Sequence, residues 1–127
     1  MTIFDILALT ACAVGAGLGG YAFINPGWAS RLVRLVPMEG KKEGPSEFRA
    51  TLGLLFFGTH AFGGWALLTS QPGADMAAAT LGAAWLGSSV GRAVSLYVDN
   101  TVSRLNVFNV FFEFTLGCAL FSPLLLG

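Results

Sequence analysis

Charged residues are scarce in this chain of 127 residues, only 11% of which are Asp, Glu, Lys or Arg. Soluble domains contain roughly 25% charged residues. Because 54% of the residues are hydrophobic, a fold surrounded by water would leave too much apolar surface exposed. The formal net charge of zero also provides no basic field for phosphates, which argues against a nucleic-acid partner. The composition therefore predicts an integral membrane protein.

Residues that usually build metal, redox or catalytic sites are also few. The two cysteines, Cys12 and Cys118, lie far apart in apolar stretches without a CxxC spacing, and His60 has no second histidine at ligand spacing. No nucleophile elbow or phosphate-binding loop organises the serines and carboxylates. We therefore expect no metal, no catalytic residue and no enzymatic activity, and no motif identifies a cofactor.

Four apolar segments, at about 3–25, 47–70, 74–99 and 101–126, are each long enough to cross a bilayer core of about 30 Å. Asn25-Pro26-Gly27 and Gln71-Pro72-Gly73 are typical helix ends, and Pro45-Ser46 suggests an N-cap for the second segment. Residues 28–36 combine Trp and two arginines in a short amphipathic stretch typical of an interfacial helix. The sequence predicts one all-α domain over 1–127, an integral membrane four-helix bundle with an interfacial helix after the first span.

All the basic residues lie around the first and third predicted loops. They are Arg31, Arg34, Lys41, Lys42, Arg49, Arg92 and Arg104. By the positive-inside rule these two loops are cytoplasmic, so both termini are expected on the non-cytoplasmic side. The pattern favours a bacterial-type inner membrane, with membrane lipids as the first expected partners.

Small residues recur at four-residue spacing, which lets membrane helices approach closely. The first span carries Gly15, Gly19, Ala16 and Gly20, and the third carries Ala79, Ala83, Gly87 and Gly91. We expect these faces to be packing seams inside the bundle. Contact with another subunit is the alternative.

Polar residues recur every three or four positions in three predicted spans, so each set lies on one helix face. Because an unpaired charge deep in a bilayer costs at least about 3 kcal/mol, we expect the three faces to converge on a buried polar cluster. Its predicted members are Glu47, Arg49, His60, Arg92, Ser95, Asp99, Asn109 and Glu113. A guanidinium pairs well with a carboxylate, which predicts an ion pair between Arg92 and Glu113, with Asp99 as the other acid in reach.

Three interpretations of the cluster remain open. Its five charged members form a salt-bridge network that fixes helix register, or it is a pocket open to the cytoplasmic leaflet that holds an anionic lipid head or a small acid. A proton relay through Glu113 and His60 is the third, although a hydrogen-bonded core histidine is the simpler interpretation of His60. The phenylalanines at positions 108, 111, 112 and 114 surround Glu113, where they either wall an apolar cavity or, as is more common, simply face lipid or pack against other side chains.

Several short motifs carry a resemblance to a known family. They are Tyr21-Ala22-Phe23-Ile24-Asn25-Pro26, Glu47-Phe48-Arg49-Ala50 followed by Gly53, Gly91-Arg92 followed by Ser95 and Asp99, and Glu113. With these motifs the chain resembles small four-helix membrane proteins grouped with the DoxX-like proteins. The resemblance implies a four-helix bundle in which the charged residues at 47, 49, 92, 99 and 113 match the family's charged positions, and it implies no activity.

Two functional hypotheses follow. The first is a non-enzymatic accessory or structural membrane protein, for example a small subunit of a larger bioenergetic complex or a homo-oligomer. The alternative is a protein that binds or transports a lipid or small amphipathic anion through the buried Arg/Glu cluster, with Arg92 and Arg49 as the anion contacts beside an apolar cavity.

Overall fold

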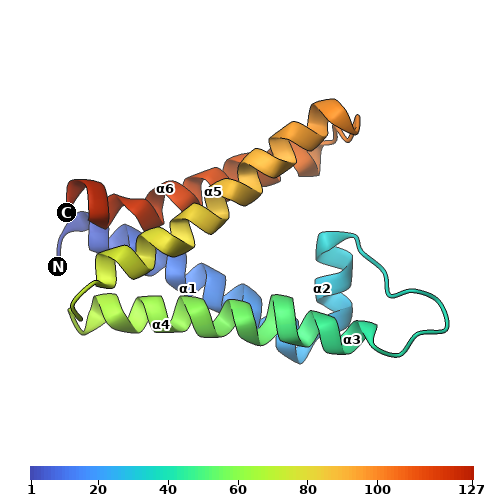
Figure 1. Ribbon diagram of the computed structural model, residues 1–127, viewed down its shortest axis with the longest axis horizontal. Helices are drawn as coiled ribbons and strands as arrows, with labels where there is room; N and C mark the ends of the chain where they lie inside the picture. The colour runs from blue at the N-terminus through green and yellow to red at the C-terminus, as the bar shows by residue number, and fades with distance from the viewer. The chain divides into compact units, whose positions relative to one another are not determined.

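The computed structural model describes all residues, 1–127, and consists of helices without strands. In chain order they are α1 (Ile3–Ile24), α2 (Pro26–Val33), α3 (Gly44–Glu47), the π-helix η1 (Phe48–Leu55), α4 (Phe56–Leu68), α5 (Ala74–Val98) and α6 (Arg104–Leu126) (Figure 1). Because α3, η1 and α4 form one continuous segment, the chain has five separate helices. The all-α prediction is confirmed.

Three of these helices, Ile3–Ile24, Gly44–Leu68 and Arg104–Leu126, combine the length and the hydropathy needed to cross a bilayer. The 25-residue helix α5 does not belong to this group. Its length is sufficient, but Asp75, Arg92, three serines and one threonine lower its hydropathy.

The helix α2 differs at both ends from the interfacial helix predicted at 28–36. It begins at Pro26 because the Asn25 side chain accepts a hydrogen bond of 2.9 Å from the Trp28 backbone N–H and so caps it. It ends at Val33 because Arg34 adopts a left-handed conformation with φ 57°. The N–H groups of Arg34 and Leu35 then close the last turn on the preceding carbonyls, as in a Schellman motif.

Two other helix starts were also predicted imperfectly. The last helix begins at Arg104, later than the predicted 101, because Ser103 is its N-cap and accepts a 3.2 Å bond from the Asn106 backbone N–H. The second long segment begins at Gly44, with Glu43 at the N-cap position, so the predicted cap at Pro45-Ser46 is wrong. A π-helix follows it directly, which no local sequence rule predicted.

The chain divides into two compact units. Unit 1 comprises Met1–Ala11 and Gly63–Gly127, and unit 2 comprises Cys12–Phe62. The helices α1 and α4 contribute residues to both units.

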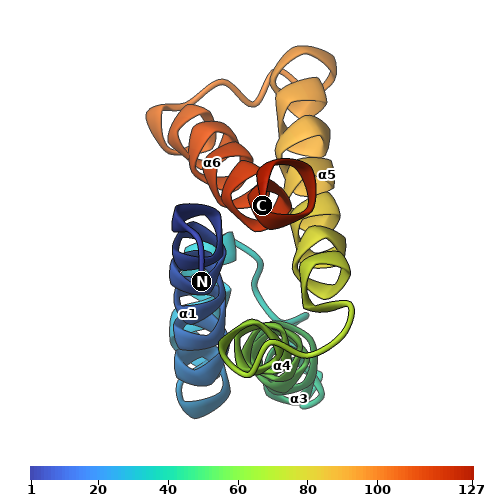
Figure 2. The ribbon, with the colours of Figure 1, turned by 90° about the vertical axis from the view of Figure 1, so that its left-hand side faces the viewer.

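In unit 1, α5 and α6 pack side by side (Figure 2). Their contact is close at two glycines: a Cβ at Gly82 would lie 2.9 Å from the Gly117 carbonyl oxygen, and one at Gly117 would lie 2.6 Å from Leu86 Cγ. Trp85 of α5 is buried and meets Phe112 of α6 edge to face, with ring centroids 6.0 Å apart. Further along α6, the Ser122 hydroxyl reaches the Phe4 carbonyl at 3.4 Å.

The small-residue face predicted for α5 is not the one that packs on α6. Ala79 is buried, but Ala83, Gly87 and Gly91 are exposed, and a Cβ at either glycine would meet nothing within 4 Å. The packed face instead contains the neighbouring positions Ala78, Gly82, Trp85, Ser89 and Arg92. Polar groups decide this choice, because Ser89 and Arg92 both have their hydrogen-bond partners on α6.

In unit 2, the glycine face predicted for the first helix is a packing seam, as expected. A Cβ at Gly19 would collide with the Phe57 backbone nitrogen, and one at Gly15 would collide with the His60 ring. On the opposite side of the seam, a Cβ at Gly53 would lie 3.0 Å from Phe23 Cα. Only glycine therefore fits at these positions without a shift of the helices.

Candidate functional site

The predicted ion pair between Arg92 of α5 and Glu113 of α6 is present. Its geometry is bidentate: Arg92 Nη2 donates to Glu113 Oε1 at 2.7 Å, and Arg92 Nε donates to Oε2 at 3.2 Å. This fork-to-fork arrangement is the strongest that an ion pair adopts, and a lysine could not reproduce it.

Burial differs between the two partners. The Glu113 side chain is 8% exposed, whereas the Arg92 side chain is 34% exposed. The negative charge of Glu113 is therefore balanced by the guanidinium and not by water. The guanidinium itself keeps part of its surface exposed on the side that faces away from Glu113. Three of its five N–H groups are directed away from the two bonds with Glu113.

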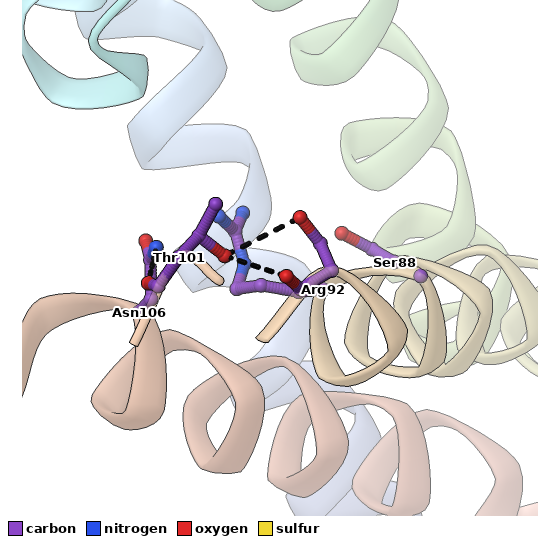
Figure 3. A pocket seen from close by; sticks show the side chains of 6 residues that line it. Ser88, Arg92, Thr101 and Asn106 are labelled. Carbon is purple, nitrogen blue, oxygen red and sulfur yellow. Dashed lines mark hydrogen bonds between the residues drawn. The ribbon is translucent and has the colours of Figure 1, made fainter. Parts of the chain in front are cut away.

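A polar pocket of about 320 Å³ lies beside the exposed part of Arg92 (Figure 3). It is formed by the last turns of α5, the connection that follows and the first turn of α6. Its lining residues are Ser88, Gly91, Arg92, Ser95, Thr101 and Asn106. No large apolar side chain lines it, and the phenylalanines of α6 do not contribute to it. Phe108, Phe111 and Phe114 are exposed, and Phe112 packs against Trp85.

Hydrogen bonds fix the floor of this pocket. Thr101 Oγ1 donates to the Ser95 carbonyl oxygen at 3.0 Å, and Asn106 Nδ2 donates to the Thr101 carbonyl oxygen at 2.7 Å. Ser95 Oγ donates to Asp99 Oδ2 at 2.7 Å. Asp99 is therefore bonded to a serine hydroxyl and not to Arg92, so the predicted salt-bridge network does not include it.

Four residues of the pocket were not among the predicted cluster members: Ser88, Gly91, Thr101 and Asn106. Ser88 shares the helix face of Arg92, and Thr101 follows the Asp99-Asn100 turn, where a hydroxyl residue often bonds to the backbone. Conversely, Asn109 is half-buried on α6 and does not line the pocket. Ser95 belongs both to the predicted cluster and to the pocket.

The other predicted members, Glu47, Arg49 and His60, belong to unit 2. Glu47 is exposed. Arg49 Nη1 donates to the Phe23 carbonyl oxygen at 2.9 Å, and its guanidinium lies 5.9 Å from the centre of the Phe23 ring. Arg49 therefore caps the C-terminal end of α1, where a cation is favoured by the helix dipole.

His60 is a hydrogen-bonded core residue, as the simpler interpretation predicted. It is 3% exposed, and its Nδ1 donates to the Phe56 carbonyl oxygen at 2.8 Å, since a carbonyl can only accept. The ring also packs against Gly15 and lies 4.7 Å from the Phe56 ring. No three His, Cys, Asp or Glu side chains of the chain lie close enough together to hold a metal ion.

Comparison with known proteins identifies the family. A family model described as a domain of unknown function, DUF4345, matches residues 3–124. The chain belongs to this family. The match includes four of the five separate helices completely, α6 as far as Leu124, and all residues of the pocket. No match was found among curated proteins or solved structures, and the resemblance to DoxX-like proteins stays a prediction.

In chemical terms, the pocket of this DUF4345 chain is equipped for binding. It combines a fixed guanidinium, hydroxyl groups and an amide within one small volume, and these groups recognise oxygen-rich polar groups by hydrogen bonding. Its volume is at the lower end of the range of about 300–1,000 Å³ that is typical of small-molecule sites.

Proposed function

We propose that the chain is an inner-membrane protein of four spans in which α5 is the third span. Three helices are apolar enough to cross a bilayer by themselves, and α5 packs along one of them, α6. A helix with polar residues is tolerated in a membrane when those residues find partners inside the protein. Arg92 and Ser89 do so, since Ser89 Oγ donates to the Val110 carbonyl oxygen at 2.8 Å.

The orientation follows from the basic residues. With the first and third loops in the cytoplasm, the connection between α5 and α6 and the loop after α2 both lie on the cytoplasmic side. The pocket is then at the cytoplasmic end of its helix pair. Arg92 lies seven residues before Asp99, which corresponds to roughly 10 Å along the helix, the depth of lipid head groups and the first acyl carbons.

We propose that this pocket binds the polar head of a membrane lipid or of a small amphipathic molecule, without chemical conversion of it. The observation that supports the proposal is the Arg92 guanidinium, which Glu113 holds by one edge while its other N–H groups are directed away from that pair at the wall of the pocket. A guanidinium fixed in this way loses little conformational entropy when a ligand binds.

A test of this proposal compares lipids retained by the full chain in mild detergent, using native mass spectrometry. The informative variants are Arg92→Lys, which keeps the charge but loses the fork geometry, and Ser88→Ala, which removes an exposed hydroxyl. Arg104→Ala is the matched control, because Arg104 is exposed and does not line the pocket. We expect a retained lipid to be lost from both pocket variants and kept by the control. Equal retention by all three variants would contradict a head-group site here.

A second candidate function, an accessory subunit of a larger membrane complex or a homo-oligomer, is favoured by the exposed small-residue face of α5. Ala83, Gly87 and Gly91 lie on one side of the helix, and the space beside both glycines is open. Membrane helices use such faces to approach one another. Blue-native electrophoresis of Gly87→Leu against wild type tests this function: a loss of a larger assembly supports it, and a monomer in both samples contradicts it.

A further inference from the structure

The wall of the α5 and α6 pocket carries no net charge. Arg92 is the only charged residue that lines it, and the bidentate carboxylate of Glu113 neutralises that charge from behind. Asp99 adds a negative charge next to Ser95, while Arg104, at the start of α6, is exposed and does not line the pocket. An anionic group that enters therefore gains little Coulomb energy, although it would lose most of its hydration.

Donors and acceptors are both present in the pocket. Donors come from the N–H groups of Arg92 that are directed away from Glu113 and from the Ser88 hydroxyl. Acceptors come from Ser95 and Thr101, because their hydroxyl protons are directed to Asp99, to the Ser95 carbonyl oxygen and to the 3.3 Å contact between the two hydroxyls. Their remaining lone pairs can accept hydrogen bonds.

Asn106 contributes a further acceptor. Its Nδ2 is held by the Thr101 carbonyl oxygen at 2.7 Å, which fixes the amide and leaves Oδ1 able to accept. An ionised phosphate has only acceptor oxygens at neutral pH, so it would face these three acceptors without a proton to offer. A hydroxyl group donates and accepts at once and matches both sets.

We propose that the pocket selects an uncharged, hydroxyl-bearing head group, such as a glycerol or sugar with neighbouring hydroxyls, over an anionic one. This inference rests on the proposed head-group binding and specifies its ligand class. The donors of Arg92 and Ser88 bind one hydroxyl oxygen, and a neighbouring hydroxyl donates to Ser95, Thr101 or Asn106. Glu113 sets the preference, because it cancels the charge that would otherwise attract an anion.

The experiment uses a matched pair of ligands that differ only in a phosphate, 1-oleoylglycerol and 1-oleoylglycerol 3-phosphate. Binding to the full chain in nanodiscs of uncharged phosphatidylcholine is measured by native mass spectrometry or titration. We expect wild type to bind the uncharged lipid more tightly, by about tenfold. Free glycerol is added as a competitor. Competition at millimolar concentrations identifies a soluble polyol as the ligand, and no competition identifies the lipid. Both results agree with recognition of hydroxyl groups.

Two variants test the cause of the preference. Ser88→Ala removes one donor and is expected to weaken binding of the uncharged lipid about fivefold, the equivalent of one hydrogen bond. Glu113→Gln leaves the guanidinium with an unbalanced charge, so the preference is expected to shift toward the phosphate lipid by at least about tenfold. Glu39→Gln, which removes an exposed loop carboxylate, is the control and should leave the preference unchanged.

The possible outcomes separate this inference from the proposed function. If wild type prefers the phosphate lipid, and Ser88→Ala weakens that binding, the pocket is a head-group site but the inference about charge is wrong. An unchanged preference in folded Glu113→Gln also overturns the inference. If Ser88→Ala and Arg92→Lys alter binding of neither lipid, the proposed function itself fails.

Discussion

Removal of Arg92 and removal of Glu113 should lower the free energy of unfolding by different amounts. Loss of one partner of a fully buried pair costs about 3–5 kcal/mol, whereas exposed pairs contribute about 0–1 kcal/mol. In Arg92→Ala the remaining carboxylate is only 8% exposed, so we expect a loss of about 3 kcal/mol in the free energy of unfolding. In Glu113→Ala the remaining guanidinium is 34% exposed and can reach water, so we expect about 2 kcal/mol.

The assay is a double-mutant cycle in which unfolding in mixed micelles is followed by tryptophan fluorescence. Because the two side chains share both hydrogen bonds, the double variant Arg92→Ala/Glu113→Ala should be less destabilised than the sum of the single variants, by about 2 kcal/mol. Thr115→Ala, at an exposed position of α6, serves as the control. Additive effects of the two single substitutions, within about 0.5 kcal/mol, would refute the claim that the pair is formed.

Three further predictions concern packing, capping and topology. Gly19→Ala should destabilise the protein by about 1–3 kcal/mol in thermal unfolding, because its Cβ would collide with the Phe57 backbone nitrogen of α4. Gly17→Ala should be neutral or stabilising, because a Cβ there would meet nothing within 4 Å. Arg49→Ala should lower the free energy of unfolding by about 1–2 kcal/mol, because the C-terminus of α1 loses its charged hydrogen bond. A midpoint temperature of thermal unfolding equal to that of the wild type would contradict the capping role. In a cysteine-free background, Lys42→Cys should react with an impermeant maleimide only from the cytoplasmic side and Gln71→Cys only from the other, and labelling of both from one side would contradict the proposed orientation.

The ion pair could be predicted from the sequence because its partners have few alternatives. Arg92 and Glu113 each stand in an apolar stretch, where desolvation makes an unpaired charge costly, and each lies on the same helix face as other polar residues. The same reasoning identified Gly15 and Gly19 as a close-packed seam, since few other residues let two helices approach so closely.

Other features depend on choices that the local sequence does not encode. Small residues occupy two neighbouring faces of α5, and the face that packs is the one that carries the hydrogen bonds of Ser89 and Arg92 with α6 and the edge-to-face contact of Trp85. Arg49 was expected to join a charged cluster, but its hydrogen-bond partner in unit 2 is the main-chain carbonyl of Phe23. Every residue has such a carbonyl, so the sequence does not show which one an arginine will bind. The π-helix Phe48–Leu55 likewise has no signature among the propensities of its residues.

The head-group site is tested most directly by photo-crosslinking in the membrane. A monoacylglycerol with a photoactivatable group on its glycerol head is incorporated into vesicles with the full chain, irradiated, and the labelled peptides are mapped by mass spectrometry. The account predicts label within residues 88–106, reduced by Ser88→Ala and unaffected by Arg104→Ala. Label confined to other segments, or label within 88–106 that Ser88→Ala leaves unchanged, would contradict it.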